Sequence, residues 1–140
     1  MQATKMKPGA FKHIEAELSY YYETVKRIKQ RREEIMLSSS TDENIGGGKS
    51  NIPSRPTEQL ATRLADDLHL QELVRIASSI EHVYNICDKE RKKLILLKYW
   101  THPQTKTWDG IAQDLNISKR QAYRWRDEIV QAIGEKLGWR

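Results

Sequence analysis

A cationic stretch near the C-terminus carries the clearest chemistry in this sequence. The nine residues from Ser118 to Arg126 contain four cations and no anion: Lys119, Arg120, Arg124 and Arg126. A solvated helix face usually mixes acidic with basic side chains, whereas this stretch provides a local positive field that suits phosphates. Arginine can also donate two hydrogen bonds to one guanine edge, and Tyr123 can contact a thymine methyl group or a phosphate. The stretch is therefore predicted to contact double-stranded DNA.

Two helices joined by a tight turn would position these cations. The predicted helix at residues 107–115 begins on a threonine cap, and the helix at residues 118–137 begins on a serine cap. Asn116 suits the turn, because asparagine tolerates a positive φ better than most residues. Ala112 is small where the helices cross, and the other contacts between them are assigned to Ile111, Leu115, Ile117, Ala122, Trp125 and Ile129. Residues 107–137 are thus predicted to form a helix-turn-helix.

The second of these helices has one buried and one exposed side. At about 3.6 residues per turn, the buried side carries Ala122, Trp125, Ile129 and Ile133. The exposed side presents Arg120, Tyr123, Arg124 and Asp127. Arg126 lies beside the core, where a backbone phosphate or a nearby acid would hold it. The predicted DNA-binding residues are Ser118, Lys119, Arg120, Tyr123, Arg124 and Arg126.

The rest of the chain also shows helical spacing of apolar residues and no alternating strand pattern, so the fold is predicted to be all-α. Residues 1–37 are assigned to a long N-terminal helix, running from Phe11 to about Leu37. Its apolar stripe would pack either on the rest of the chain or on another copy in a homo-oligomer, and both alternatives remain open. Residues 38–56, rich in glycine and serine, are assigned to a flexible linker.

Residues 57–140 are predicted to form a helical DNA-binding domain that includes the helix-turn-helix. Thr57 would cap its first helix, in which a break near Leu70 is expected, and Asp88 would cap a shorter helix. On that shorter helix the basic residues are expected to face water: Lys89, Arg91, Lys92 and Lys93.

The sequence argues against catalysis, cofactors and metals. Cys87 is the only cysteine, so neither an intrachain disulfide nor a thiolate metal site is expected. The GGGKS segment lacks a phosphate loop's first glycine, since Glu43 stands at that position. The histidines, His13, His69, His82 and His102, are scattered, and Asp66 and Asp67 beside His69 have no matching ligand cluster elsewhere. The chain is predicted not to be an enzyme.

Composition points to a protein that stays inside the cell. The net charge is +5 and 38% of the residues are hydrophobic. No stretch approaches the roughly 20 apolar residues of a membrane span, and no apolar run follows the first lysines as in a signal peptide. A cytoplasmic location without membrane contact is expected.

Several runs of the sequence resemble known DNA-binding proteins. TWDGIAQDLNISKRQAYRWRDEIV resembles the last, promoter-reading domain of sigma factors, and DKERKKLILLKYW matches the helix that packs before it there. Together with IEAELSYYYETVKRI and PTEQLATRL, these runs resemble phage transcriptional regulators of the RinA and ArpU type across nearly the whole chain outside the linker.

The resemblance implies activation of phage late genes, those for packaging and morphogenesis, in a bacterial host cell with RNA polymerase as a partner. It implies no catalytic residues, and the sigma-like match implies DNA contact for the six residues named above. One alternative remains, a small terminase subunit, because such a subunit also combines a helix-turn-helix with a helical assembly segment and recognises packaging DNA.

Overall fold

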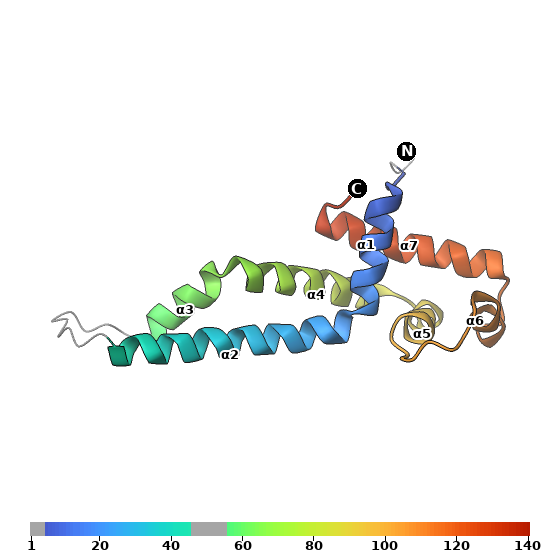
Figure 1. The fold of residues 1–140 in the computed structure, drawn as a ribbon. Coiled ribbons are helices and arrows are strands. Elements are labelled where there is room, and N and C mark those ends of the chain that lie inside the picture. The colour runs from blue at the N-terminus through green and yellow to red at the C-terminus, as the bar shows by residue number, and fades with distance from the viewer. Residues whose placement is uncertain (1–4, 46–55) are drawn as a thin grey trace. The chain divides into compact units, whose positions relative to one another are not determined.

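The computed structural model describes residues 5–45 and 56–140, and all regular structure in these ranges is helical. The helices are α1 (Pro8–Ser19), α2 (Tyr21–Ile45), α3 (Pro56–Asp66), α4 (Leu68–Ile86), α5 (Lys89–Lys98), α6 (Trp108–Asp114) and α7 (Lys119–Leu137) (Figure 1). This confirms the all-α prediction. Within the described ranges, no helix is both long enough and apolar enough to cross a membrane.

The chain divides into two compact units. The first unit comprises Met1–Tyr22 and Ile76–Arg140, and the second comprises Glu23–Arg75. The predicted DNA-binding residues therefore all belong to the first unit, together with α1, α5, α6 and α7. The predicted boundaries of a DNA-binding domain at residues 57–140 and a linker at 38–56 remain predictions.

In the first unit, α1 packs across α7 (Figure 1). The crossing is close because α7 has a glycine there: a Cβ added at Gly134 would stand 3.0 Å from Cδ1 of Ile14. Ile14 and Leu18 of α1 are completely buried in the core. The Tyr99 hydroxyl also donates a 2.6 Å hydrogen bond to Glu15 of α1. The apolar stripe of α1 is thus covered within the chain, which was one of the two alternatives for this segment.

The helix expected from Phe11 to about Leu37 is divided at Tyr20, whose φ of −92° and ψ of 13° end α1. Tertiary contacts explain the division. The Leu18 carbonyl accepts a 2.9 Å hydrogen bond from Nε1 of Trp100. The ring of Tyr21 then stacks on Trp100, at 5.1 Å between centroids. The second helix, α2, continues to Ile45, so residues 38–45 of the expected linker are helical and residues 46–55 lie outside the described ranges.

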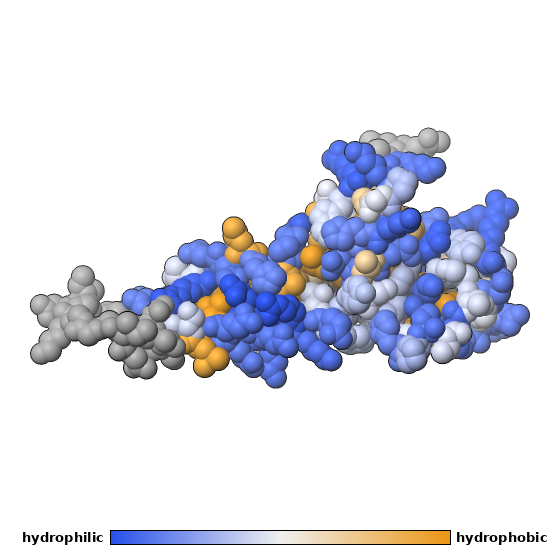
Figure 2. All heavy atoms as spheres, viewed as in Figure 1, coloured by the Kyte–Doolittle hydropathy of each residue, from blue (hydrophilic) through white to orange (hydrophobic). Residues whose placement is uncertain are grey.

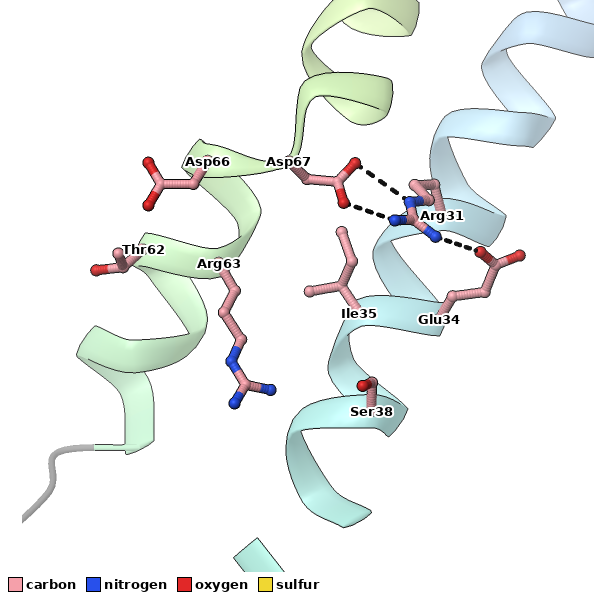
Figure 3. Close-up of a pocket in the computed structure, with 8 residues that line it drawn as sticks. All are labelled: Arg31, Glu34, Ile35, Ser38, Thr62, Arg63, Asp66 and Asp67. Carbon is pink, nitrogen blue, oxygen red and sulfur yellow. Dashed lines mark hydrogen bonds and ion pairs between the residues drawn. The ribbon is translucent and has the colours of Figure 1, made fainter. Parts of the chain in front are cut away.

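The second unit contains most of α2, all of α3 and the beginning of α4. Arg31 of α2 donates to both carboxylate oxygens of Asp67, at 3.2 and 2.6 Å (Figure 3). Asp67 also caps α4 by accepting a 2.8 Å hydrogen bond from the Leu70 amide. The break expected near Leu70 therefore falls at Asp67. The hydrogen bonds from Arg31 and the backbone hold the pKa of Asp67 below its ordinary value.

Among the side chains of the second unit that the structure describes, few large apolar ones are buried, namely Ile28, Ile35 and Leu70. Others remain on its surface, among them Met36, Leu37 and Leu68. Hydrophobic residues are accordingly visible over α2, α3 and α4 in Figure 2.

Two sequence predictions about residues 56–93 need correction. Helix α3 begins at Pro56, whose fixed φ suits the first helical position, so Thr57 lies inside the helix instead of capping it. Asp88 does cap α5, accepting a 2.9 Å hydrogen bond from the Arg91 amide. Arg91, however, is half-buried, with its Cζ 4.9 Å from the centre of the Trp125 ring. Lys92 also lies over an aromatic ring, that of Tyr84, whereas Lys89 and Lys93 face water as expected.

Candidate nucleic-acid interface

Local hydrogen bonds fix the ends of α6 and α7. The Thr107 hydroxyl accepts from the Gly110 amide at 3.1 Å, and the Ser118 hydroxyl accepts from the Gln121 amide at 3.0 Å. Both caps are as predicted. Asn116 has a φ of 56°, the positive value expected of it in the turn. The sequence therefore sets where α7 begins and how it leaves α6.

The core holds one side of α7. Ala122, Ile129 and Ile133 are at most 1% exposed, and Trp125 is 8% exposed. This confirms the predicted rotation of the helix. Arg91 covers the Trp125 ring while it also pairs with Glu128 on the next turn of α7, at 2.9 Å. Because this side cannot turn outward, the opposite side of α7 is fixed in solvent.

That opposite side begins with four exposed residues, Ser118, Lys119, Arg120 and Arg124. Arg120 and Arg124 lie four residues apart, so their side chains are neighbours on the same face. Within the described residues, neither has an ion-pair or hydrogen-bond partner. Both guanidinium groups are thus available for an external ligand.

Lys119 is partly neutralised by the protein itself. Its Nζ lies 3.5 Å from Oδ2 of Asp109 in α6. The negative charge of Asp109, helped by the nearby Tyr123, raises the pKa of Lys119. A phosphate would therefore compete with Asp109 for this ammonium group.

Tyr123 and Arg126 point into an aromatic cluster. Cζ of Arg126 lies 4.7 Å from the centre of the Tyr123 ring, 5.2 Å from that of Phe11 and 5.6 Å from that of Trp108. Tyr123 meets Trp108 edge to face, at 5.2 Å between centroids. Arg126 also donates to Oδ1 of Asp127 at 2.9 and 2.8 Å, which is the local acid that the sequence offered as one alternative. Direct DNA contact by Tyr123 and Arg126 stays a prediction.

Sequence reasoning did not include Phe11 or Trp108 in this surface. Trp108 could have been noticed, because it directly follows the Thr107 cap and so lies at the amino end of the first helix of the predicted helix-turn-helix. No local sequence feature pointed to Phe11, because Phe11 and Arg126 are in contact but lie far apart in the sequence.

The described residues offer no sign of a metal centre. No group of three or more His, Cys, Asp or Glu side chains in residues 5–45 and 56–140 could hold a metal ion. His13 instead stacks on Trp139 at 4.3 Å between centroids, and Asp67 is engaged by Arg31. Burial raises the pKa of Cys87.

Comparison with known proteins places the chain in a family. Residues 12–135 match a family described as protein of unknown function (DUF722). The transcriptional activator rinA of Staphylococcus phage phi11 is 27% identical over 134 residues, which cover 95% of this chain and 94% of that protein. No solved structure matches the chain. The match to rinA confirms the resemblance to RinA-type phage regulators, and the family match, which includes α6 and α7 as far as residue 135, shows that the chain belongs to the DUF722 family.

Proposed function

We propose that this protein is a transcriptional activator that binds specific sites in double-stranded DNA through the amino-terminal half of α7. One observation carries the proposal: Arg120 and Arg124 are neighbours on the exposed side of a helix whose other side is locked in the core. The activator role is supported by the similarity to rinA of phage phi11. The targets we propose are phage late genes for packaging and morphogenesis, read in the cytoplasm of a bacterial host.

In the proposed complex, the amino end of α7 enters the major groove. Arg120 and Arg124 then read bases, because a guanidinium group can donate two parallel hydrogen bonds to the edge of a guanine. Ser118 uses an oxygen lone pair to cap the helix, which leaves its hydroxyl proton to donate to a phosphate. Lys119 contributes an ammonium group to the same backbone. Tyr123 and Arg126 complete the predicted DNA-binding residues. The main contribution of Arg126 is to hold the Tyr123 ring in position.

Activation also needs a surface that contacts RNA polymerase. Even a weak contact suffices, because DNA tethers both proteins at a high effective concentration. A coupling free energy of about 1.4 kcal/mol raises polymerase occupancy tenfold at an unsaturated promoter. Lys89 and Lys93 of α5 are the residues we propose for this contact, because both are exposed. Neither belongs to the proposed DNA-binding ridge, the exposed side of α7 that carries Ser118, Lys119, Arg120 and Arg124.

The test begins by selecting bound duplexes from a random pool and placing the selected site upstream of a promoter. Adding the protein to purified bacterial RNA polymerase should raise transcript yield. A variant with Lys89→Ala and Lys93→Ala should bind the site normally but lose the increase, whereas Lys136→Ala, at the far end of α7, should retain it. If occupied DNA gives no increase and the protein instead stimulates a packaging ATPase, the small terminase alternative replaces the activator.

A further inference from the structure

A strip of cations and aromatic rings extends from α7 to α6 and α5. The Nζ atom of Lys98, in the last turn of α5, lies 5.0 Å from the centre of the Trp108 ring. Trp108 contacts Tyr123 edge to face, and Nζ of Lys119 lies 5.8 Å from the centre of the Tyr123 ring. Direct contacts thus connect Lys98 to the proposed DNA-binding ridge.

We propose that Lys98 binds a backbone phosphate of duplex DNA at a second position, outside α7, and that Trp108 holds the lysine in place for this contact. The inference rests on the proposed duplex binding and adds a sequence-independent contact to it. Lys98 belongs to neither of the two helices predicted to form the helix-turn-helix.

Within the described residues, no acidic side chain neutralises the positive charge of Lys98. Among the described residues it has no carboxylate partner, whereas Lys106 pairs with Asp114 and Lys119 lies 3.5 Å from Asp109. Arg126 lies on the same Trp108 ring, with its Cζ 5.6 Å from the ring centre, but its charge is paired with that of Asp127. An anion is therefore the chemically matched ligand for this end of the strip.

The aromatic support makes phosphate binding less costly. A free lysine side chain loses considerable rotamer freedom when it is fixed by a ligand. Because the Lys98 side chain already lies over Trp108, part of this freedom is restricted before DNA arrives. Trp108 also contacts Tyr123 of α7 edge to face, so Lys98 is connected through Trp108 to the proposed reading helix.

The chemistry of Lys98 favours a phosphate over a base. An ammonium group is a compact charge without the planar fork that lets arginine recognise a guanine edge. Phosphate contacts fix the orientation of a protein on the duplex and carry no sequence information directly. Lys98 would therefore set the angle at which α7 meets the groove, while Arg120 and Arg124 provide the discrimination.

The test compares Lys98→Gln with Lys93→Gln in the full-length protein. Both variants remove one positive charge from α5, but Lys93 is exposed and lies about 140° around the helix from Lys98. Binding is measured on the selected duplex and on a random-sequence duplex across a range of salt concentrations, with folding checked by circular dichroism. Lys98→Arg, which keeps the charge, provides a second variant.

Lys98→Gln should lower the slope of log affinity against log salt by about 1. Its affinity should fall by the same factor on both duplexes. Lys93→Gln and Lys98→Arg should keep the wild-type slope, and Arg120→Ala should weaken the selected duplex preferentially. If Lys98→Gln keeps the slope of Lys93→Gln while Arg120→Ala still loses discrimination, the Lys98 contact is refuted and the proposed function stands. If the wild-type protein binds neither duplex, the proposed function itself fails.

Discussion

The guanidinium carbon of Arg126 lies 4.7 Å from the centre of the Tyr123 ring, one turn earlier on the same helix. Arg126 also contacts Phe11 of α1 and Trp108 of α6, so a single cation joins three helices next to the proposed DNA-binding ridge. Its main expected role is therefore to hold that ridge in position.

Replacing Arg126 with alanine should destabilise the first unit. A cation over an aromatic face contributes about 0.5–1 kcal/mol at an exposed site, and these contacts are not additive. We expect a loss of about 1 kcal/mol, or a melting temperature lower by about 4–8 °C. Arg124→Ala is the matched control, since it removes the same charge from an exposed position of α7. Equal melting temperatures for the two variants would show that the aromatic cluster does not stabilise the fold.

Substitution of Gly134 tests the crossing of α1 and α7, and Gly110 of α6 provides the control. An added Cβ at Gly134 would meet the flexible end of the Met6 side chain first, and would also stand 3.0 Å from Cδ1 of Ile14 and 3.3 Å from the carbonyl oxygen of Trp139. At Gly110 the nearest atom, Oγ1 of Thr107, would be at an ordinary 3.6 Å. Both alanines gain helix propensity, so Gly134→Ala should be less stable than Gly110→Ala by the overpacking cost, about 1–3 kcal/mol. Chemical denaturation measures the difference. If Gly134→Ala were as stable as Gly110→Ala, the close crossing would be absent in solution.

Trp125 tests the contact between α7 and the rest of the core. It is 8% exposed, and within the described residues its Nε1 has no hydrogen-bond partner, so its contribution comes from packing, which includes the contact of Arg91 with its ring. Trp125→Ala should cost about 3–5 kcal/mol, the usual range for emptying a large aromatic site. Leu96→Ala, at an exposed position of α5, should change the melting temperature little. A Trp125→Ala protein that melts like the wild type would mean that α7 is rotated differently.

The pairing of Arg31 with Asp67 predicts a pH effect in the second unit (Figure 3). Hydrogen bonds, first from Arg31, lower the pKa of Asp67 below its ordinary value of 3.8. A lowered folded-state pKa stabilises the fold above the unfolded pKa, and the contribution is lost as pH falls through the folded value. Asp67→Asn removes this titration but keeps a residue suited to capping α4.

Denaturation of both proteins between about pH 5 and pH 2 provides the measurement. The advantage of the wild type over Asp67→Asn should shrink as the pH falls. A constant difference would mean that the ion pair contributes nothing to the stability of this unit.

Short-range chemistry explains what the sequence could predict. Thr107, Asn116 and Ser118 set the ends of α6 and α7 through contacts no more than a few residues apart, and the apolar period set which side of α7 is buried. One failure was local, since α3 begins at Pro56 and Thr57 does not cap it. The other failures involve distant residues. The hydrogen bond from Nε1 of Trp100 to the Leu18 carbonyl helps to end α1, and no local sequence pattern predicts it.

The same reasoning applies to the candidate site. Residue type and spacing identified Arg120 and Arg124, because exposed positions on a helix follow from its period alone. The environment of Arg126 depends on Phe11 and Trp108, whose positions are set by tertiary packing.

Arg120 and Arg124 are proposed to hold and read duplex DNA, and DNA binding by the double variant Arg120→Ala, Arg124→Ala decides whether they do. Each lost base contact should cost about 1–3 kcal/mol on the selected duplex. The control is Lys136→Ala, which removes a charge at the far end of α7. We expect the double variant, still folded by circular dichroism, to lose most of its affinity and its preference for the selected site, while Lys136→Ala retains both. Unchanged affinity and preference in the folded double variant would contradict the account.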